Sequence, residues 1–248
     1  MDPNLTPALM PPAGVASNLN EPNAIMPMRI AVSVIVLLLC FIGVTLRTYT
    51  RVAILKKFNL EDCALLFAVA GFSAFTVIII IAGEHGDGKH QWNVSLADVA
   101  DILLYVNIVE ILYGPTMFCA KYAVLRQIES IFLAHRRDSR TYKAIWALIW
   151  MNLVFYLILT FLFLFSCIPR EKIWNPAIDG HCIDQQNNIV ATSGINVVSD
   201  VTILIVPLVA IAKLQLPLKT KIGSAAVFAI GILYGTLYLL SISYHTFA

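Results

Sequence analysis

The sequence has little charge. Acidic and basic residues make up 13% of its 248 positions, about half the share found in average soluble domains. The formal net charge is only +2, and no block of like charges forms a basic tail. Without a basic patch the chain lacks the electrostatic footprint of a nucleic-acid-binding protein, so no nucleic-acid partner is expected.

Hydrophobic residues, by contrast, make up 59% of the chain, above the roughly 45–50% of soluble domains. They gather in six runs near the length of about 20 helical residues that a bilayer core requires. Lipid admits only helices or closed barrels, and the runs do not alternate as barrel strands do. The sequence therefore predicts an all-α, polytopic transmembrane helical bundle with the lipid bilayer as its first partner. The six expected spans are residues 30–46, 63–82, 102–120, 144–167, 189–212 and 222–244.

Lysines and arginines are divided unequally between the two sides of this bundle. Thirteen fall in the loops after the first, third and fifth spans, and four fall on the other side. Basic loops stay in the cytoplasm, so the N-terminus is predicted to lie outside. We expect the protein to be in the plasma membrane. The thirteen are Arg47, Arg51, Lys56, Lys57, Lys121, Arg126, Arg136, Arg137, Arg140, Lys143, Lys213, Lys219 and Lys221, and the four are Arg29, Lys89, Arg170 and Lys172.

Residues 1–25 contain prolines and asparagines but no lysine or arginine. A signal peptide begins with basic residues, so we interpret this stretch as a disordered extracellular lead, followed by a membrane domain over residues 26–248. Two sequons, at Asn4 and Asn93, fall on the outer side and are candidate glycosylation sites. Cys167 and Cys182 also fall there, where a disulfide can persist; the alternative is two free thiols.

Two acids lie inside the predicted spans. Glu110 is near the middle of the third span and Asp200 near the middle of the fifth. An acid at a helix centre costs roughly 2.5–3.5 kcal/mol on insertion scales, so both are expected to face the bundle interior. Asn107, Asn196 and Ser199 add polarity at helical spacing. These five positions fit a switch, a cation site or a proton path, and equally a hydrogen-bond network between helices.

The stretch EHGDGKH, residues 84–90, follows the second span. It lacks the GxxxxGK[ST] pattern of a phosphate loop. His85, Asp87 and His90 are suitable metal ligands, but we favour a tight outer turn without a metal, in which Gly86 and Gly88 take positive φ angles. Its two histidines would still change charge between about pH 5 and 8.

The order of these features resembles the fungal rhodopsin-domain integral membrane proteins, a family of seven-helix, receptor-like proteins. The resemblance covers roughly residues 30–235. It is carried by RTYTRVAILKKFNLEDCALLFA, EHGDGKH, KYAVLRQIESIF, CIPREKIWNPAIDGHC and the stretch from NVVSDVT to FAIG. The positions that match the family's outer-loop pattern are His85, Gly86, Gly88, His90, Cys167, Trp174 and Cys182, and Asp200 matches its acid in helix 5.

The resemblance implies a receptor-like protein that senses an unknown extracellular ligand and signals to a cytoplasmic partner such as a G protein. Members have a seventh helix, whereas this sequence stops soon after the sixth span. We therefore expect a truncated gene model, a splice form or a degenerate copy. A retinal Schiff base needs a lysine within a span, and the six runs contain none. We therefore predict no retinal and no other cofactor.

Three other functions were weighed against the receptor. A transporter or ion-conducting protein would use Glu110, Asn196 and Asp200 near the midplane. An enzyme is not expected, because no HExxH or GxSxG motif occurs. A non-signalling, truncated copy is the third alternative.

Overall fold

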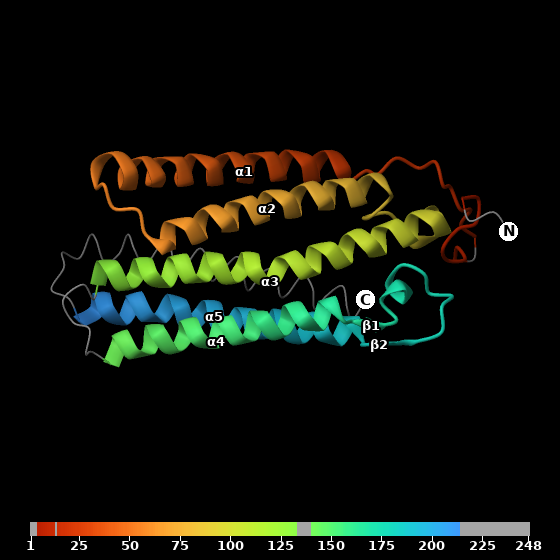
Figure 1. Cartoon of the computed structure of the whole chain (residues 1–248). Helices are drawn as coiled ribbons and strands as arrows, with labels where there is room; N and C mark the ends of the chain where they lie inside the picture. The colour runs from red at the N-terminus through yellow and green to blue at the C-terminus, as the bar shows by residue number, and fades with distance from the viewer. Residues whose placement is uncertain (1–3, 13, 133–139, 214–248) are drawn as a thin grey trace. The chain divides into compact units, whose positions relative to one another are not determined.

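The computed structural model describes residues 4–12, 14–132 and 140–213 (Figure 1). The long helices are α1 (Met26–Tyr49), α2 (Leu60–Glu84), α3 (Leu96–Phe132), α4 (Arg140–Leu164) and α5 (Gln185–Lys213). Short elements join them: the π-helix η1 (Thr50–Ile54), the 3-10 helices η2 (Gln91–Asn93) and η3 (Arg170–Ile173), and the antiparallel strands β1 (Cys167–Ile168) and β2 (His181–Cys182). The expected all-α helical bundle is confirmed.

Four helices of the described part are long and apolar enough to cross a membrane: Met26–Ile54, Leu60–Glu84, Arg140–Leu164 and Asn187–Val206. They correspond to the first, second, fourth and fifth expected spans. The third expected span lies inside α3, which is not among the four, and the sixth, residues 222–244, lies outside the described residues. The number of six helices is therefore not confirmed.

Apolar side chains cover the outside of these helices. No residue of α1 is buried, and Leu39 and Ile35 on it are 65% and 58% exposed. Polar side chains lie inside instead: Asn107 is 1% exposed and Asp62 is 2% exposed. Apolar side chains such as Leu125 and Ile145 are buried as well, so the described helices are apolar both inside and outside, as a bilayer as solvent allows.

The chain divides into two compact units, each described by itself. The first comprises Met1–Ala123 and Phe155–Ile183, and the second Val124–Val154 and Asp184–Ala248. In the first unit, Tyr156, Leu159 and Phe163 of α4 form a buried cluster against α3. Gly114 makes close packing possible there, because a Cβ at this position would lie 3.1 Å from the carbonyl oxygen of Tyr156.

Buried ion pairs join the end of α1 to the start of α2, which lie side by side (Figure 1). Oδ1 of Asp62 accepts hydrogen bonds from Nε and Nη2 of Arg47 at 3.1 and 3.0 Å. Nη2 of Arg51 donates to Oε1 of Glu61 at 2.9 Å. Oδ2 of Asp62 accepts the backbone N–H of Asn59 at 3.1 Å and so caps α2. We call this group the α1–α2 ion-pair cluster.

Candidate functional site at the loop end

Residues 84–95 and 165–182, together with the N-terminal segment 4–25, gather at one end of the first unit, which we call the loop end (Figure 1). The turn after α2 has the predicted backbone. Gly86 and Gly88 have φ angles of 105° and 96°, which other residues rarely adopt. At Gly88 a Cβ would also lie 2.9 Å from Nη2 of Arg29.

The three residues of this turn that could have served as metal ligands point to different partners. Asp87 forms an ion pair with Arg29, whose Nη1 lies 2.8 Å from Oδ2. His90 stacks on Trp92, with ring centroids 4.4 Å apart. His85 instead faces α3, where its Nδ1 lies 3.2 Å from Oδ1 of Asp98. The metal set considered from the sequence, His85 with Asp87 and His90, is therefore not brought together.

The N-terminal segment, which we expected to be disordered, lies against this turn in its described part. Oγ of Ser17 donates to the carbonyl of Trp92 at 2.5 Å. Nδ2 of Asn23 donates to the carbonyls of Gly83 and Asp87 at 3.1 and 2.9 Å. The backbone N–H of Ala8 donates to the carbonyl oxygen of Val94 at 3.0 Å. The segment has little regular structure, but hydrogen bonds hold it in place.

These contacts argue against one glycosylation candidate, which stays a prediction. Asn93 is only 6% exposed. Its Oδ1 accepts the N–H of Asn18 at 2.9 Å, and its Nδ2 donates to the carboxylate of Glu21. A glycan on Nδ2 would disturb the bond to Glu21 at a side chain that is already buried, so the folded structure disfavours a glycan at Asn93. Asn4 is exposed and stays a candidate.

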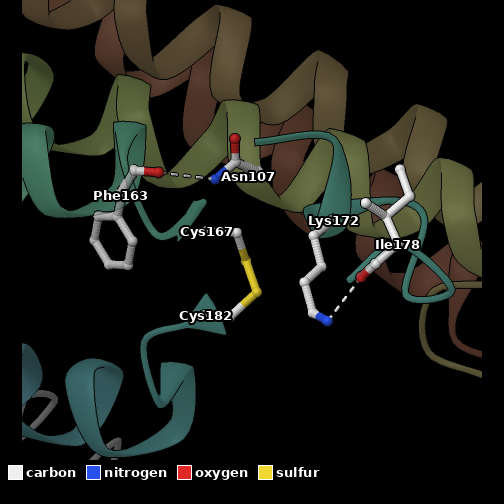
Figure 2. Close-up of a disulfide and its surroundings, with 6 residues drawn as sticks. All are labelled: Asn107, Phe163, Cys167, Lys172, Ile178 and Cys182. Carbon is white, nitrogen blue, oxygen red and sulfur yellow. Dashed lines mark hydrogen bonds between the residues drawn. A yellow bond between two sulfur atoms is a disulfide. The ribbon is translucent and has the colours of Figure 1, made fainter. Parts of the chain in front are cut away.

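Residues 165–182 form the second loop of the loop end. A disulfide between Cys167 and Cys182, the pair considered from the sequence, closes this loop (Figure 2). The two cysteines face each other across β1 and β2. Nζ of Lys172 donates to the carbonyl of Ile178 at 2.8 Å and holds the rest of the loop together. In the same view, Nδ2 of Asn107 donates to the carbonyl of Phe163 at 3.1 Å, so the buried amide joins α3 to α4 next to the disulfide.

A cavity of about 450 Å³ lies between the first turns of α3 and this loop. Its lining is mainly apolar and includes Leu96, Ala100 and Leu103 from α3 and Trp174 and Pro176 from the loop. Its volume lies within the range of pockets that bind small molecules. Trp174, selected from the sequence only by resemblance, thus lies in a wall of the cavity.

The polar positions within the helices fall in both units. Glu110 is half-buried on α3 in the first unit. In the second, the buried face of α5 passes through Thr192, Asn196 and Ile203. Asp200 lies beside that face and is exposed, which differs from the inward position expected for it.

Sequence reasoning missed two buried polar residues. Oγ of Ser199 donates to Oδ1 of Asn152 on α4 at 2.8 Å, and Asn152 is 5% exposed. Lys121, assigned to a cytoplasmic loop, is instead a buried residue of α3 whose ammonium lies 5.4 Å from the ring centroid of Tyr156. For Asn152 the signal was a polar side chain within an apolar run, residues 144–167. For Lys121 the one signal was the resemblance of KYAVLRQIESIF to the family's helix 3, because α3 continues 12 residues beyond the apolar run.

The fungal rhodopsin domain matches residues 46–244 of the chain. A SAT4 family membrane protein of Emericella nidulans is 41% identical over 159 residues, which are 64% of this chain and 41% of that protein. Fugralins biosynthesis cluster protein 2 of Gibberella zeae is 30% identical over 240 residues, which are 92% of this chain and 58% of that protein. The chain thus spans less than two thirds of the length of either relative, and no solved structure matches it. A domain match over most of the chain, on a bundle of apolar helices, shows that this multi-pass membrane protein belongs to the fungal rhodopsin domain family.

Proposed function

We propose that the protein is receptor-like: its loop end faces the outside of the cell and detects a cue, and its opposite end meets a cytoplasmic signalling protein of the G-protein kind. The cavity at the loop end carries the proposal. Its volume of about 450 Å³ and its apolar lining fit a small molecule. One wall is a long helix, and the other is a loop closed by the disulfide.

Charge supports this orientation. Thirteen of the 17 basic residues belong to the side predicted to be cytoplasmic. Arg47 and Arg51 lie at the end of the α1–α2 pair that is opposite to the loop end (Figure 1). A disulfide persists in oxidising surroundings and is rare in the cytosol, so the bridge between Cys167 and Cys182 supports an outer location for the loop end. On the same grounds we propose the plasma membrane.

A continuous helix supplies a physical route for signalling. α3 begins with the cavity wall at Leu96 and runs for 37 residues to Phe132. A ligand that prefers one position of its first turns shifts the population of helix positions by its difference in affinity. The buried bond from Asn107 to the carbonyl of Phe163 passes such a shift to α4. No retinal takes part in this proposal, and a visible absorption band in the purified protein would contradict that part of it.

The test uses the full chain reconstituted with a heterotrimeric G protein, with a solvent extract of the growth medium as the probe. Extract-dependent nucleotide exchange is expected for the wild type and is lost in Ala100→Trp, whose indole fills the cavity. Ala70→Trp is the matched control, because Ala70 is exposed on α2 and does not line the cavity. No exchange with any extract, or equal exchange in both variants, contradicts the proposal and leaves the non-signalling copy as the simpler explanation.

A transporter or ion channel is the second candidate, and the polar residues of the second unit favour it. Asn196 is 7% exposed, and Ser199 and Asn152 are hydrogen-bonded beside it on α5 and α4. Within the same unit, Asp200 would complete a cation path with them, and Glu110 of the first unit stays a separate candidate. Ion flux into vesicles that contain the protein, abolished by Asp200→Asn, would support this function over the receptor.

A further inference from the structure

The end of α2 and the first turns of α3 bring one imidazole and two carboxylates together. Nδ1 of His85 lies 3.2 Å from Oδ1 of Asp98 and 3.6 Å from Oδ2 of Asp101. Each residue offers one potential ligand atom, and these atoms lie within 4.8 Å of one another. The cavity and the polar residues of the spans use neither acid, so this trio is a separate feature of the loop end.

Neighbours outside the trio hold its members in place. Oγ of Ser95 donates to Oδ2 of Asp98 at 2.6 Å, which leaves Oδ1 facing His85. The ring of Tyr105 packs against the imidazole of His85, with centroids 5.6 Å apart. Asp98 and Asp101 are three residues apart on one helix and therefore share a face. Support of this kind around potential ligands is typical of protein metal sites.

The charge of the trio suits a divalent cation. With a neutral imidazole, the two carboxylates carry a charge of −2. Within the described part of the chain, no lysine or arginine forms an ion pair with Asp98 or Asp101. A proton on His85 would cancel only half of this charge, whereas a divalent cation would cancel all of it.

The donor set and the two spacings from His85 fit one class of metal. Zinc bonds of about 2.0–2.2 Å to nitrogen and oxygen place neighbouring tetrahedral ligands about 3.4 Å apart, between the two observed spacings of 3.2 and 3.6 Å. Calcium and magnesium prefer oxygen ligands alone. We propose that His85, Asp98 and Asp101 form a binding site for a divalent transition metal, zinc above all, with its fourth position open to water. The side chains are 31%, 43% and 53% exposed, so the ion enters from solvent.

A bound ion would tie the end of α2 to the first turns of α3, which also form a wall of the cavity. Zinc in the surroundings would thereby set how freely that wall moves. The site itself does not depend on the receptor role, and the two proposals are tested by different measurements.

The test is titration of the purified full chain, in lipid nanodiscs, with zinc chloride alone, followed by calorimetry. One zinc ion per chain is expected for the wild type. His85→Gln and Asp101→Asn should each weaken the affinity by more than about 100-fold, because even outer-shell partners contribute roughly 10- to 100-fold. Zinc should also raise the unfolding temperature of the wild type but not of these variants.

Two matched controls keep the result specific. His90→Gln removes a histidine that stacks on Trp92, and Asp179→Asn removes an exposed acid of the second loop; both should bind zinc as the wild type does. If His85→Gln fails to fold, Asp101→Asn decides, since the contact with His85 is the one ion pair of Asp101 in the described part of the chain. A wild type that binds no zinc, or binding that survives in Asp101→Asn, overturns the proposal and leaves an ordinary ion pair.

Discussion

Substitution of Asp62 tests the α1–α2 ion-pair cluster most directly. The residue is 2% exposed, and Oδ1 accepts two N–H groups of Arg47 at 3.1 and 3.0 Å. Oδ2 accepts the N–H of Asn59 at the start of α2. Asp62→Asn keeps one oxygen acceptor and the shape of the side chain, but it removes the negative charge on which the two bonds from Arg47 depend.

The expected cost follows from these contacts. A hydrogen bond to a charged group contributes about 1.5–3 kcal/mol, and a neutral one about 0.5–1.5 kcal/mol. Arg47 stays charged, so its two bonds to the remaining oxygen are weakened and not lost, and the amide nitrogen that replaces Oδ2 cannot accept from Asn59. Together these changes should lower the free energy of unfolding by about 2–3 kcal/mol. This lies below the roughly 3–5 kcal/mol for breaking a fully buried pair, because the side chain of Arg47 is 18% exposed and water can reach it.

The assay is equilibrium unfolding of the purified chain in bicelles, followed by circular dichroism. A double-mutant cycle with Arg47→Leu, Asp62→Leu and the double variant isolates the coupling, and the double variant should be less destabilised than the sum of the two single variants. Asp179→Asn, an exposed acid, is the control and should stay within about 0.5 kcal/mol of the wild type. A loss below about 0.5 kcal/mol for Asp62→Asn, or strictly additive effects, would refute the reasoning.

Three further outcomes are expected. Gly114→Val should destabilise the first unit by about 1–3 kcal/mol, because even a Cβ there lies 3.1 Å from the carbonyl oxygen of Tyr156; thermal unfolding of the variant measures this, and wild-type stability would contradict it. Cys182→Ser should cost about 3 kcal/mol, since its bond to Cys167 closes a loop with a sequence separation of 15 residues; unchanged unfolding with and without reductant would argue against this. Treatment with a glycosidase should release no glycan from the position of Asn93, which mass spectrometry of its peptide checks directly; a glycosylated peptide from folded protein would show that the buried position is wrong.

Local chemistry made part of the loop end predictable. Two glycines between polar residues after an apolar run predict a turn with positive φ, and Gly86 and Gly88 have it. The apolar runs predict helices, because the backbone has no other partner in lipid. The same runs do not show where a helix ends. α3 continues through Lys121, whose ammonium is covered by Tyr156 from another helix.

Contacts between segments that are distant along the chain could not be predicted from the sequence. His85, Asp87 and His90 are close along the chain in EHGDGKH. In the folded turn, however, the three side chains point in different directions. His85 contacts Asp98 and Asp101, which lie outside that stretch. Asp200 and Asn196 are one helical turn apart, yet one is exposed and the other buried. Which of them faces inward is decided by the packing of α4 on α5, where Asn152 accepts from Ser199.

The contacts of the N-terminal segment have a consequence for the order in which the protein is made. The bond from Ser17 to Trp92 joins residues 75 positions apart. At roughly 5–20 residues per second of synthesis, the segment leaves the ribosome about 4–15 seconds before its partners exist. During that interval Ser17 and Asn23 have no hydrogen-bond partners in the turn after α2, and they gain them only when that turn has formed. The loop end is therefore completed late, and any enzyme that modifies this segment has its best access before the second helix is finished.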